Sequence, residues 1–580
     1  MAEHRLLAAL VVASVVAVDP GGWWPYGPAK QGVIIAGFAA MVALTRRYRV
    51  GPLGRLVSVG AGVFLGALAL AALFGADPVM AWIGTPERRM GVVGWCTLAA
   101  AFVVGRRLGA VNVLRALTAG AAAFVLVGLF ESMGVTAVDL DAGSGRLLGP
   151  YGSASYTGSA GVVFTAVLLL QAHRWHGKAR FLALLGGLVS AALTIATSSR
   201  SAWVGLAVVA IGAGLMGARV GRARQRLGVV ALALAGVVAA ALLVPWGLAG
   251  QRASTALGSG GGLESRFDEW TIGLGIVADH PVLGVGPEGY RIAAVDHIGD
   301  AYAVAYGRDV TPDRAHNLVI DVAASVGLVG LIGWLVAVAG LLESIRRRWG
   351  MGPLLLVVAF PVAQLGLFPV VEIDPLWWLL LGGLTAANAE SPNPSRVASP
   401  TQALMAFVCA GAAVVWACAS CVEVVADRSA ASALEADIAG HRLDAVDAAQ
   451  RAVDLRPDVV RYHRVLARVA TVAAVPSSWV QRIDQLESAR RWAPDDPGLR
   501  VDIAVSWSYL ATLVPDRAAE AVEVVDAALE ADPSHPDLWF ARARVALSAG
   551  AADTVASSIN RALDLGGELP MDLLDSDGTR

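Results

Sequence analysis

Long apolar stretches recur from the N-terminus to Val422, separated by polar connections. We place thirteen of them, at residues 6–19, 31–45, 56–75, 91–105, 111–131, 158–172, 181–197, 201–217, 227–247, 317–342, 351–370, 373–388 and 401–422. An apolar helix of about 20 residues crosses the hydrocarbon core of a bilayer, where a helix satisfies its own backbone hydrogen bonds. The pattern therefore predicts an all-α, polytopic helical membrane protein with about thirteen spans.

Basic residues fall in the even-numbered connections between these stretches. They are Arg46, Arg47, Arg49, Arg55, Arg106, Arg107, Arg115, Arg174, Lys178, Arg180, Arg219, Arg222, Arg224, Arg226, Arg346, Arg347 and Arg348. Because Lys and Arg are enriched in cytoplasmic loops, we expect a cytoplasmic N-terminus and cytoplasmic even-numbered connections. The odd-numbered connections, among them the long polar stretch at residues 248–316, are then extracytoplasmic.

The composition changes after the last apolar stretch. Residues 423–580 hold 16 Lys and Arg against 26 Asp and Glu, whereas the preceding residues hold 29 against 21. This asymmetry marks a domain boundary. Helix-ending strings that close on Pro457, Pro494 and Pro533 recur at nearly even spacing, and a degenerate copy ends at Gly567. The period resembles that of tetratricopeptide repeats.

These patterns divide the chain into three parts. We expect residues 1–390 to form the polytopic membrane domain with the extracytoplasmic loop 248–316, residues 391–422 to form a linker and the last span, and residues 423–580 to form a soluble helical-repeat domain. An odd number of spans places the repeats outside the cytoplasmic membrane. The CxxC at Cys418 and Cys421 lies in an apolar segment without a second pair, so neither a zinc site nor a disulfide framework is predicted.

Three polar motifs share the predicted outer face: Arg200 within Ser198–Trp203, Arg266 within Glu264–Trp270, and the pair His316 and Asn317. Each has a plain interpretation. Arg200 could be a snorkelling arginine at the membrane interface, and Arg266 a solvated salt bridge at a helix start. A lone histidine at a helix start is more often a structural hydrogen-bonder than a catalytic base.

Taken together, the three motifs resemble those of the O-antigen ligase and polymerase family, membrane glycosyltransferases of the GT-C class. The resemblance covers roughly residues 30–390. It implies that Arg200 and Arg266 bind a polyprenyl diphosphate, that Arg314 is a reserve cation, and that His316 is an acid/base or orienting residue beside Asn317. The family often carries a Glu before the first Gly of the re-entering helix, where this chain has Ser325.

Two further loop segments bear on the candidate site. Tyr151, in a Gly- and Ser-rich segment, could line a sugar or lipid groove or belong to an ordinary loop. The string from His280 to Gly286 satisfies GxGxxG with Gly289, but no βαβ unit surrounds it, and the resemblance implies a structural turn instead. Asp139 and Asp141 form a DxD, which metal-dependent transferases use. Because two arginines supply positive charge, we expect no metal and no cofactor.

The expected function is transfer of a glycan from a polyprenyl-diphosphate-linked donor to an envelope acceptor, by an enzyme that is metal-independent and inverting. Two alternatives stay open. The same fold could polymerise lipid-linked repeat units, or the chain could be a non-catalytic scaffold or transporter whose repeats recruit partners. The expected partners are the lipid-linked donor, a glycan, lipid or protein acceptor, membrane lipid and a protein bound by the repeats, with no nucleic acid.

Overall fold

The computed structural model describes residues 2–48, 50–138, 146–217, 264–386 and 399–574. Within these ranges the chain is all-α, with short 3-10 turns and no strand. Eight of the described helices are long and apolar enough to cross a bilayer, which makes the chain a polytopic membrane protein. They are α2 (Pro28–Leu44), α3 (Arg55–Phe74), α5 (Val92–Ser132), α6 (Ala154–Arg174), α7 (Gly177–Ala196), α8 (Arg200–Gly217), α14 (Leu318–Trp349) and α17 (Pro400–Ile438).

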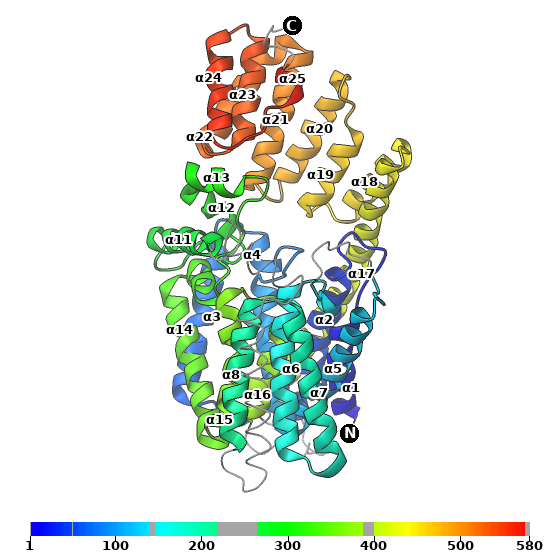
Figure 1. The fold of residues 1–580 in the computed structure, drawn as a ribbon, viewed down its shortest axis with the longest axis vertical. Helices are drawn as coiled ribbons and strands as arrows, with labels where there is room; N and C mark the ends of the chain where they lie inside the picture. The colour runs from blue at the N-terminus through cyan, green and yellow to red at the C-terminus, as the bar shows by residue number, and fades with distance from the viewer. Residues whose placement is uncertain (1, 49, 139–145, 218–263, 387–398, 575–580) are drawn as a thin grey trace.

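Three predicted spans correspond to shorter helices packed in the same bundle (Figure 1): α1 (Ala2–Val16), α15 (Met351–Ala363) and α16 (Asp374–Thr385). The apolar core of the bundle draws on α1, α2, α3, α5, α6, α7, α8, α14, α15 and α16. The predicted span at residues 227–247 lies outside the described residues, so the count of thirteen stays a prediction.

Helix α5 is two spans joined at one residue. Gly109 has φ 75° and ψ 167°, which only glycine adopts readily. Arg107 donates to the carbonyl of Val42 at the end of α2, whereas Glu131, near the end of α5, lines the same cavity as Tyr26, just before α2 begins. Gly109 therefore reverses the chain, and the two arms match the predicted spans at 91–105 and 111–131.

Helix α14 is also interrupted, at Gly327, and the turn predicted from His280 to Gly286 packs against this interruption. Gly327 has φ 68°, and the amide of Leu328 donates to the carbonyl of Pro281 at 2.8 Å. The amide of Val285 donates to the carbonyl of Ala324, also at 2.8 Å. A Cβ on Gly284 would collide with the backbone of α14, so glycine allows this close approach. The turn from His280 to Gly286 thus holds the outer loop on the top of α14.

The C-terminal part is a stack of helix pairs above the bundle (Figure 1). It contains α18 (Arg442–Leu455), α19 (Val460–Ala470), α20 (Pro476–Arg490), α21 (Pro497–Leu513), α22 (Ala518–Ala531), α23 (Pro536–Ser548), α24 (Ala552–Asp564) and α25 (Met571–Leu574). The strings ending at Pro457, Pro494 and Pro533 close α18, α20 and α22, as the repeat period predicts. Their assignment as tetratricopeptide repeats stays a prediction. Helix α17 runs continuously from the last predicted span into this stack.

Candidate functional site

Phe368 lies where the candidate residues meet. It is 3% exposed, in the segment between the 3-10 turn Gln364–Gly366 and α16. The ring of His316 lies edge-on to it at 4.9 Å between centroids, and the guanidinium of Arg88 lies 4.5 Å from its ring centre. Tyr156, at the start of α6, contacts it edge-on at 6.2 Å. One aromatic ring therefore positions the histidine and a cation side by side.

His316 is held by its neighbours in the sequence and by an acidic side chain of the outer loop. Asn317 caps α14, accepting from the amides of Val319 and Ile320. Nδ1 of His316 lies 3.0 Å from Oε2 of Glu269 in α11 (Glu264–Asp279). The ring N–H is not aligned for a hydrogen bond, so this contact acts mainly through charge. The side chain of His316 is 21% exposed, which leaves it accessible to a substrate.

Glu269 also contacts Arg266, and so links the motif that contains Arg266 to the pair His316 and Asn317. Its Oε2 lies 2.7 Å from Nη1 of Arg266, whose side chain is 37% exposed. The salt bridge expected from the plain interpretation of Arg266 is therefore present. Its acidic partner is the carboxylate that contacts His316, so the two predicted site residues share one anion.

Arg200 is the first residue of α8 and follows a strained turn. Ser198 has φ 54°, and Arg146 donates to the carbonyls of Thr197 and Ser198 at 2.9 and 3.4 Å. A Cβ on Gly366 would contact Cβ of Ser201, so the start of α8 packs against the segment that carries Phe368. Arg200 is half-buried. We find no hydrogen bond or ion pair between it and the described residues, so its guanidinium is available to an anion.

Arg314 and Tyr151 are placed differently. Arg314 is buried and pairs with Glu288, and its Nη1 lies 3.8 Å from Asp321 in α14. Its positive charge is thus already offset within the protein. Tyr151 is 4% exposed, and its ring centre lies 5.0 Å from Nζ of Lys30. Both side chains are therefore buried, whereas those of Arg266 and His316 are partly exposed. The pair Asp139 and Asp141 lies outside the described residues.

The turn between α4 (Met80–Ile83) and α5 supplies residues that the sequence pattern indicated only weakly. Arg88 pairs with Asp313, while Glu87 lies 3.7 Å from Arg461 of α19. Burial raises the pKa of Asp313, but Arg88 and Arg314 outweigh it, so the net pKa is lowered and the carboxylate stays ionised. Arg89 is buried and pairs with Glu423 of α17. The three consecutive residues thus make different contacts: Glu87 with the repeats, Arg88 with the candidate site, and Arg89 with α17.

Backbone strain gathers at the same face. The non-glycine residues with left-handed backbone among the described ranges are Arg89, Ser198, Glu288 and His316, with φ between 48° and 64°. Such conformations cost about 1–3 kcal/mol each and persist where the surroundings enforce them. Arg89, Ser198 and His316 adjoin Arg88, Arg200 and Asn317 in the chain, and Glu288 forms an ion pair with Arg314. Each strained residue is therefore next to, or paired with, a residue of the candidate site or its surroundings.

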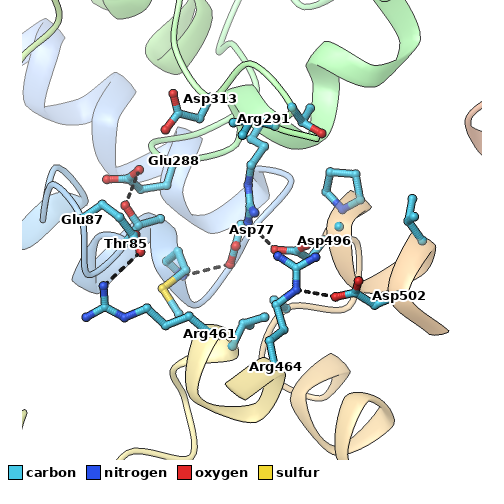
Figure 2. Close-up of a pocket in the computed structure, with 18 of the residues that line it drawn as sticks. Asp77, Thr85, Glu87, Glu288, Arg291, Asp313, Arg461, Arg464, Asp496 and Asp502 are labelled. Carbon is cyan, nitrogen blue, oxygen red and sulfur yellow. Dashed lines mark hydrogen bonds and ion pairs between the residues drawn. The ribbon is translucent and has the colours of Figure 1, made fainter. Parts of the chain in front are cut away.

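A charged hollow of about 470 Å³ opens between these outer turns and the repeats. Figure 2 shows Glu87, Glu288 and Asp313 on one side of it and residues of the repeats on the other. Arg88 and Asp313 line the hollow, and Arg88 also lies against the ring of Phe368. Arg461 and Arg464 face them from α19, and Asp496 and Asp502 from the start of α21.

Sequence reasoning missed Glu269 as a partner of His316, Asp313 as a partner of Arg88, and Phe368 entirely. Arg88 carried a usable signal, because it is basic in a connection expected to be extracytoplasmic. Phe368 carried none, since an aromatic residue between two apolar helices is ordinary.

No curated protein matches the chain, but one family model matches a part of it, residues 182–335. This part runs from α7 through the first part of α14 and contains Arg200, Arg266 and His316. It is narrower than the resemblance over residues 30–390. Residues 182–335 match the family model of the O-antigen ligase, which supports a role like that of a membrane glycosyltransferase.

Proposed function

We propose that the chain transfers a glycan from a polyprenyl-diphosphate-linked donor to a hydroxyl of an envelope acceptor, on the outer face of the cytoplasmic membrane. The observation that carries this proposal is the contact of Glu269 with both His316 and Arg266. This contact joins an imidazole, a carboxylate and a guanidinium, and Arg200, which forms no ion pair with a described residue, is the second cation of the proposal. The similarity to O-antigen ligase supports the same reaction class.

The chemistry needs fixed cations and a base. The acceptor oxygen attacks the anomeric carbon, the bond from that carbon to the diphosphate oxygen breaks, and the lipid diphosphate leaves as an anion. Arg200 and Arg266 would offset that charge. The acceptor proton passes to Nε2 of His316, since Nδ1 faces Glu269. A single displacement inverts the anomeric centre.

Glu269 has a defined part in this scheme. A ring that takes a proton becomes an imidazolium, and a carboxylate 3.0 Å away stabilises that charge. Glu269 would also hold Arg266 in place until a diphosphate competes for it. The site thus supplies its own positive charge, and the scheme requires no metal and no cofactor.

Two alternatives make different predictions for cells. A polymerase uses a second lipid-linked unit as acceptor, whereas a scaffold or transporter performs no transfer. The repeats stacked over the outer turns favour a ligase with a large acceptor, because a polymerase needs no such platform. Glycan size in a strain lacking the gene separates them. Accumulation of lipid-linked polymer of normal length supports the ligase, and accumulation of single repeat units would indicate a polymerase. An unchanged glycan profile would contradict both enzymatic roles.

A further inference from the structure

We propose that the charged hollow is the docking site of the acceptor, and that the acceptor is a protein presenting an extended segment rich in Lys or Arg. This proposal rests on the glycan-transfer function proposed above and names its acceptor class. The argument comes from position, charge, an unsatisfied buried nitrogen and the kinds of side chain that line the hollow.

The hollow lies between two bodies and leads to the candidate site. Its walls come from the turn Thr85–Arg88, the outer loop 308–313, and α19, α21 and α23 of the repeats. Asp313 lines it and lies close enough to His316 for the two charges to interact. A segment bound there would bring a hydroxyl of its chain near the histidine. The volume of about 470 Å³ accommodates a few residues of extended polypeptide.

The lining has an excess of acid. Ten Asp and Glu residues line it, against five arginines. Each of those arginines already contacts a carboxylate: Arg88 with Asp313, Arg291 with Asp496, Arg308 with Asp532, Arg461 with Asp427 and Arg464 with Asp502. Arg291 and Arg308 tie the outer loop to the repeats, whereas Arg88 and Arg464 pair within one body. Glu288 and Asp458 are offset by Arg314 and Arg456, which do not line the hollow. Three lining carboxylates, those of Asp77, Asp309 and Asp537, form no ion pair with a described residue.

Asp309 and Asp537 are the clearest examples of lining carboxylates without a cationic partner. Asp309 projects from the outer loop and Asp537 from α23, and neither forms an ion pair with a described residue. Burial raises the pKa of Asp537, and the charge of Asp309 opposite raises it further. Two like charges that approach across a junction of two bodies cost stability unless a cation lies between them. An ammonium or guanidinium from a partner would supply that cation.

His535 independently indicates that the hollow binds a group with a hydrogen-bond donor. It is 7% exposed, lines the hollow, and its Nδ1 has no partner among the described residues. Burial lowers the pKa of His535 to about 4, with Arg308 acting in the same direction, so the ring is neutral at pH 7. The backbone of Arg308 takes part in a hydrogen bond with this ring. A buried neutral imidazole with one engaged nitrogen leaves the other as an acceptor, which an N–H of a Lys or Arg satisfies.

The lining also argues against a lipid or glycan occupant. Its acidic excess repels phosphate groups and acidic sugars. No aromatic side chain is among the lining residues, whereas sugar rings bind well on aromatic faces. Val310, which is 80% exposed, and Val501 offer aliphatic surface that suits the stems of Lys and Arg.

Binding of a defined probe to the full-length protein tests the proposal. The probe is a short fluorescein-labelled peptide of alternating Lys and Ser, added without donor to protein in phosphatidylcholine nanodiscs and followed by anisotropy. Matched peptides carry Gln or Glu in place of Lys. The double variant Asp309→Asn/Asp537→Asn should bind the Lys peptide about tenfold more weakly. Because it removes a repulsion, its melting temperature should not fall. The matched control is Asp447→Asn/Asp516→Asn, which removes the same charge at exposed repeat positions outside the hollow.

The outcomes separate this proposal from the function on which it rests. Equal weakening by both double variants, or equal binding of the Gln peptide, would overturn the docking site. The His316→Ala protein should lose glycan transfer and keep peptide binding. Specific binding by a wild-type protein that transfers no glycan to any acceptor would contradict the transferase role and the acceptor assignment, and leave a protein-binding hollow. The reverse result, full transfer by Asp309→Asn/Asp537→Asn with an unchanged dependence on acceptor concentration, would reject the hollow and leave the function standing.

Discussion

The carboxylate of Glu269 lies 3.0 Å from Nδ1 of His316, although the two residues stand at opposite ends of the described part of the outer loop. The loop that carries Glu269 returns to the membrane domain at His316, and the turn from His280 to Gly286 fixes that return on α14. The contact puts a negative charge beside Nδ1 of the ring. It also explains why Arg266 and His316 form one group.

Replacing Glu269 with Gln should lower kcat for glycan transfer by about a hundredfold, because the charge that stabilises a protonated His316 is lost. The matched control is Asp268→Asn, the neighbouring acid on α11. A parallel loss in Asp268→Asn, or an unchanged kcat in Glu269→Gln, would mean that Glu269 supports only the fold of α11.

Arg200→Ala and Arg266→Ala should each reduce transfer by about a hundredfold while the protein stays folded and inserted. Arg200→Lys and Arg266→Lys should recover little activity, because a lysine keeps the charge but loses the planar pair of donors that suits a diphosphate. The rates are measured with a synthetic lipid-linked donor in envelope membranes. Near-normal transfer by Arg266→Ala would reduce Arg266 to a surface salt bridge with Glu269.

The junction of the repeats with the outer loop should weaken in acid. Burial holds the pKa of His535 at about 4, below its ordinary value of about 6.5, so the unfolded state takes up a proton first as the pH falls. Stability from this residue is therefore complete above pH 6.5 and is lost progressively between pH 6.5 and 4. At pH 5 the loss should be about 2 kcal/mol. Hydrogen exchange of α23 measures it, and His535→Gln should remove the difference between pH 7 and pH 5. The same pH dependence in His535→Gln would assign the effect to other groups.

The proposed orientation can be measured by labelling. A cysteine at Asp553, exposed at the start of α24, should react with a membrane-impermeant maleimide in intact spheroplasts when the four native cysteines are replaced. A cysteine at Arg347, whose side chain is 76% exposed in a connection expected to be cytoplasmic, should react only after lysis. The opposite pattern would reverse the orientation. Labelling of both positions before lysis would mean an even number of spans between Arg347 and the repeats.

The bundle could be predicted from the sequence because membrane spans leave a local record, an apolar run of fixed length. Even the reversal inside α5 followed from a short polar interruption near Gly109. The repeat period could also be recognised from the sequence, since each repeat ends on a similar short sequence. The motifs also predicted that Arg200, Arg266 and His316 share one face, because the two connections that carry them are both odd-numbered.

The contacts within the site could not be predicted in the same way. Phe368 meets His316 and Arg88 although all three lie in different connections, and no periodic pattern records such a meeting. For Arg314 and Tyr151, the sequence did not show that the side chain is buried against a partner inside the protein. Arg314 is basic and close to His316 in the chain, yet Glu288 already holds it. Tyr151 is aromatic in a polar loop, yet it packs inside against Lys30.

The central claim is that His316 takes part in glycan transfer. The direct measurement adds purified protein and labelled polyprenyl-diphosphate-linked glycan to envelope membranes from a strain lacking the gene, and follows label entering the acceptor fraction. His297→Ala is the matched control, since His297 lies in the same outer loop, is equally exposed and contacts Asp279 at 3.3 Å. We predict that His297→Ala transfers label at the wild-type rate and that His316→Ala is slower by about a hundredfold or more. Wild-type transfer by His316→Ala would contradict the account.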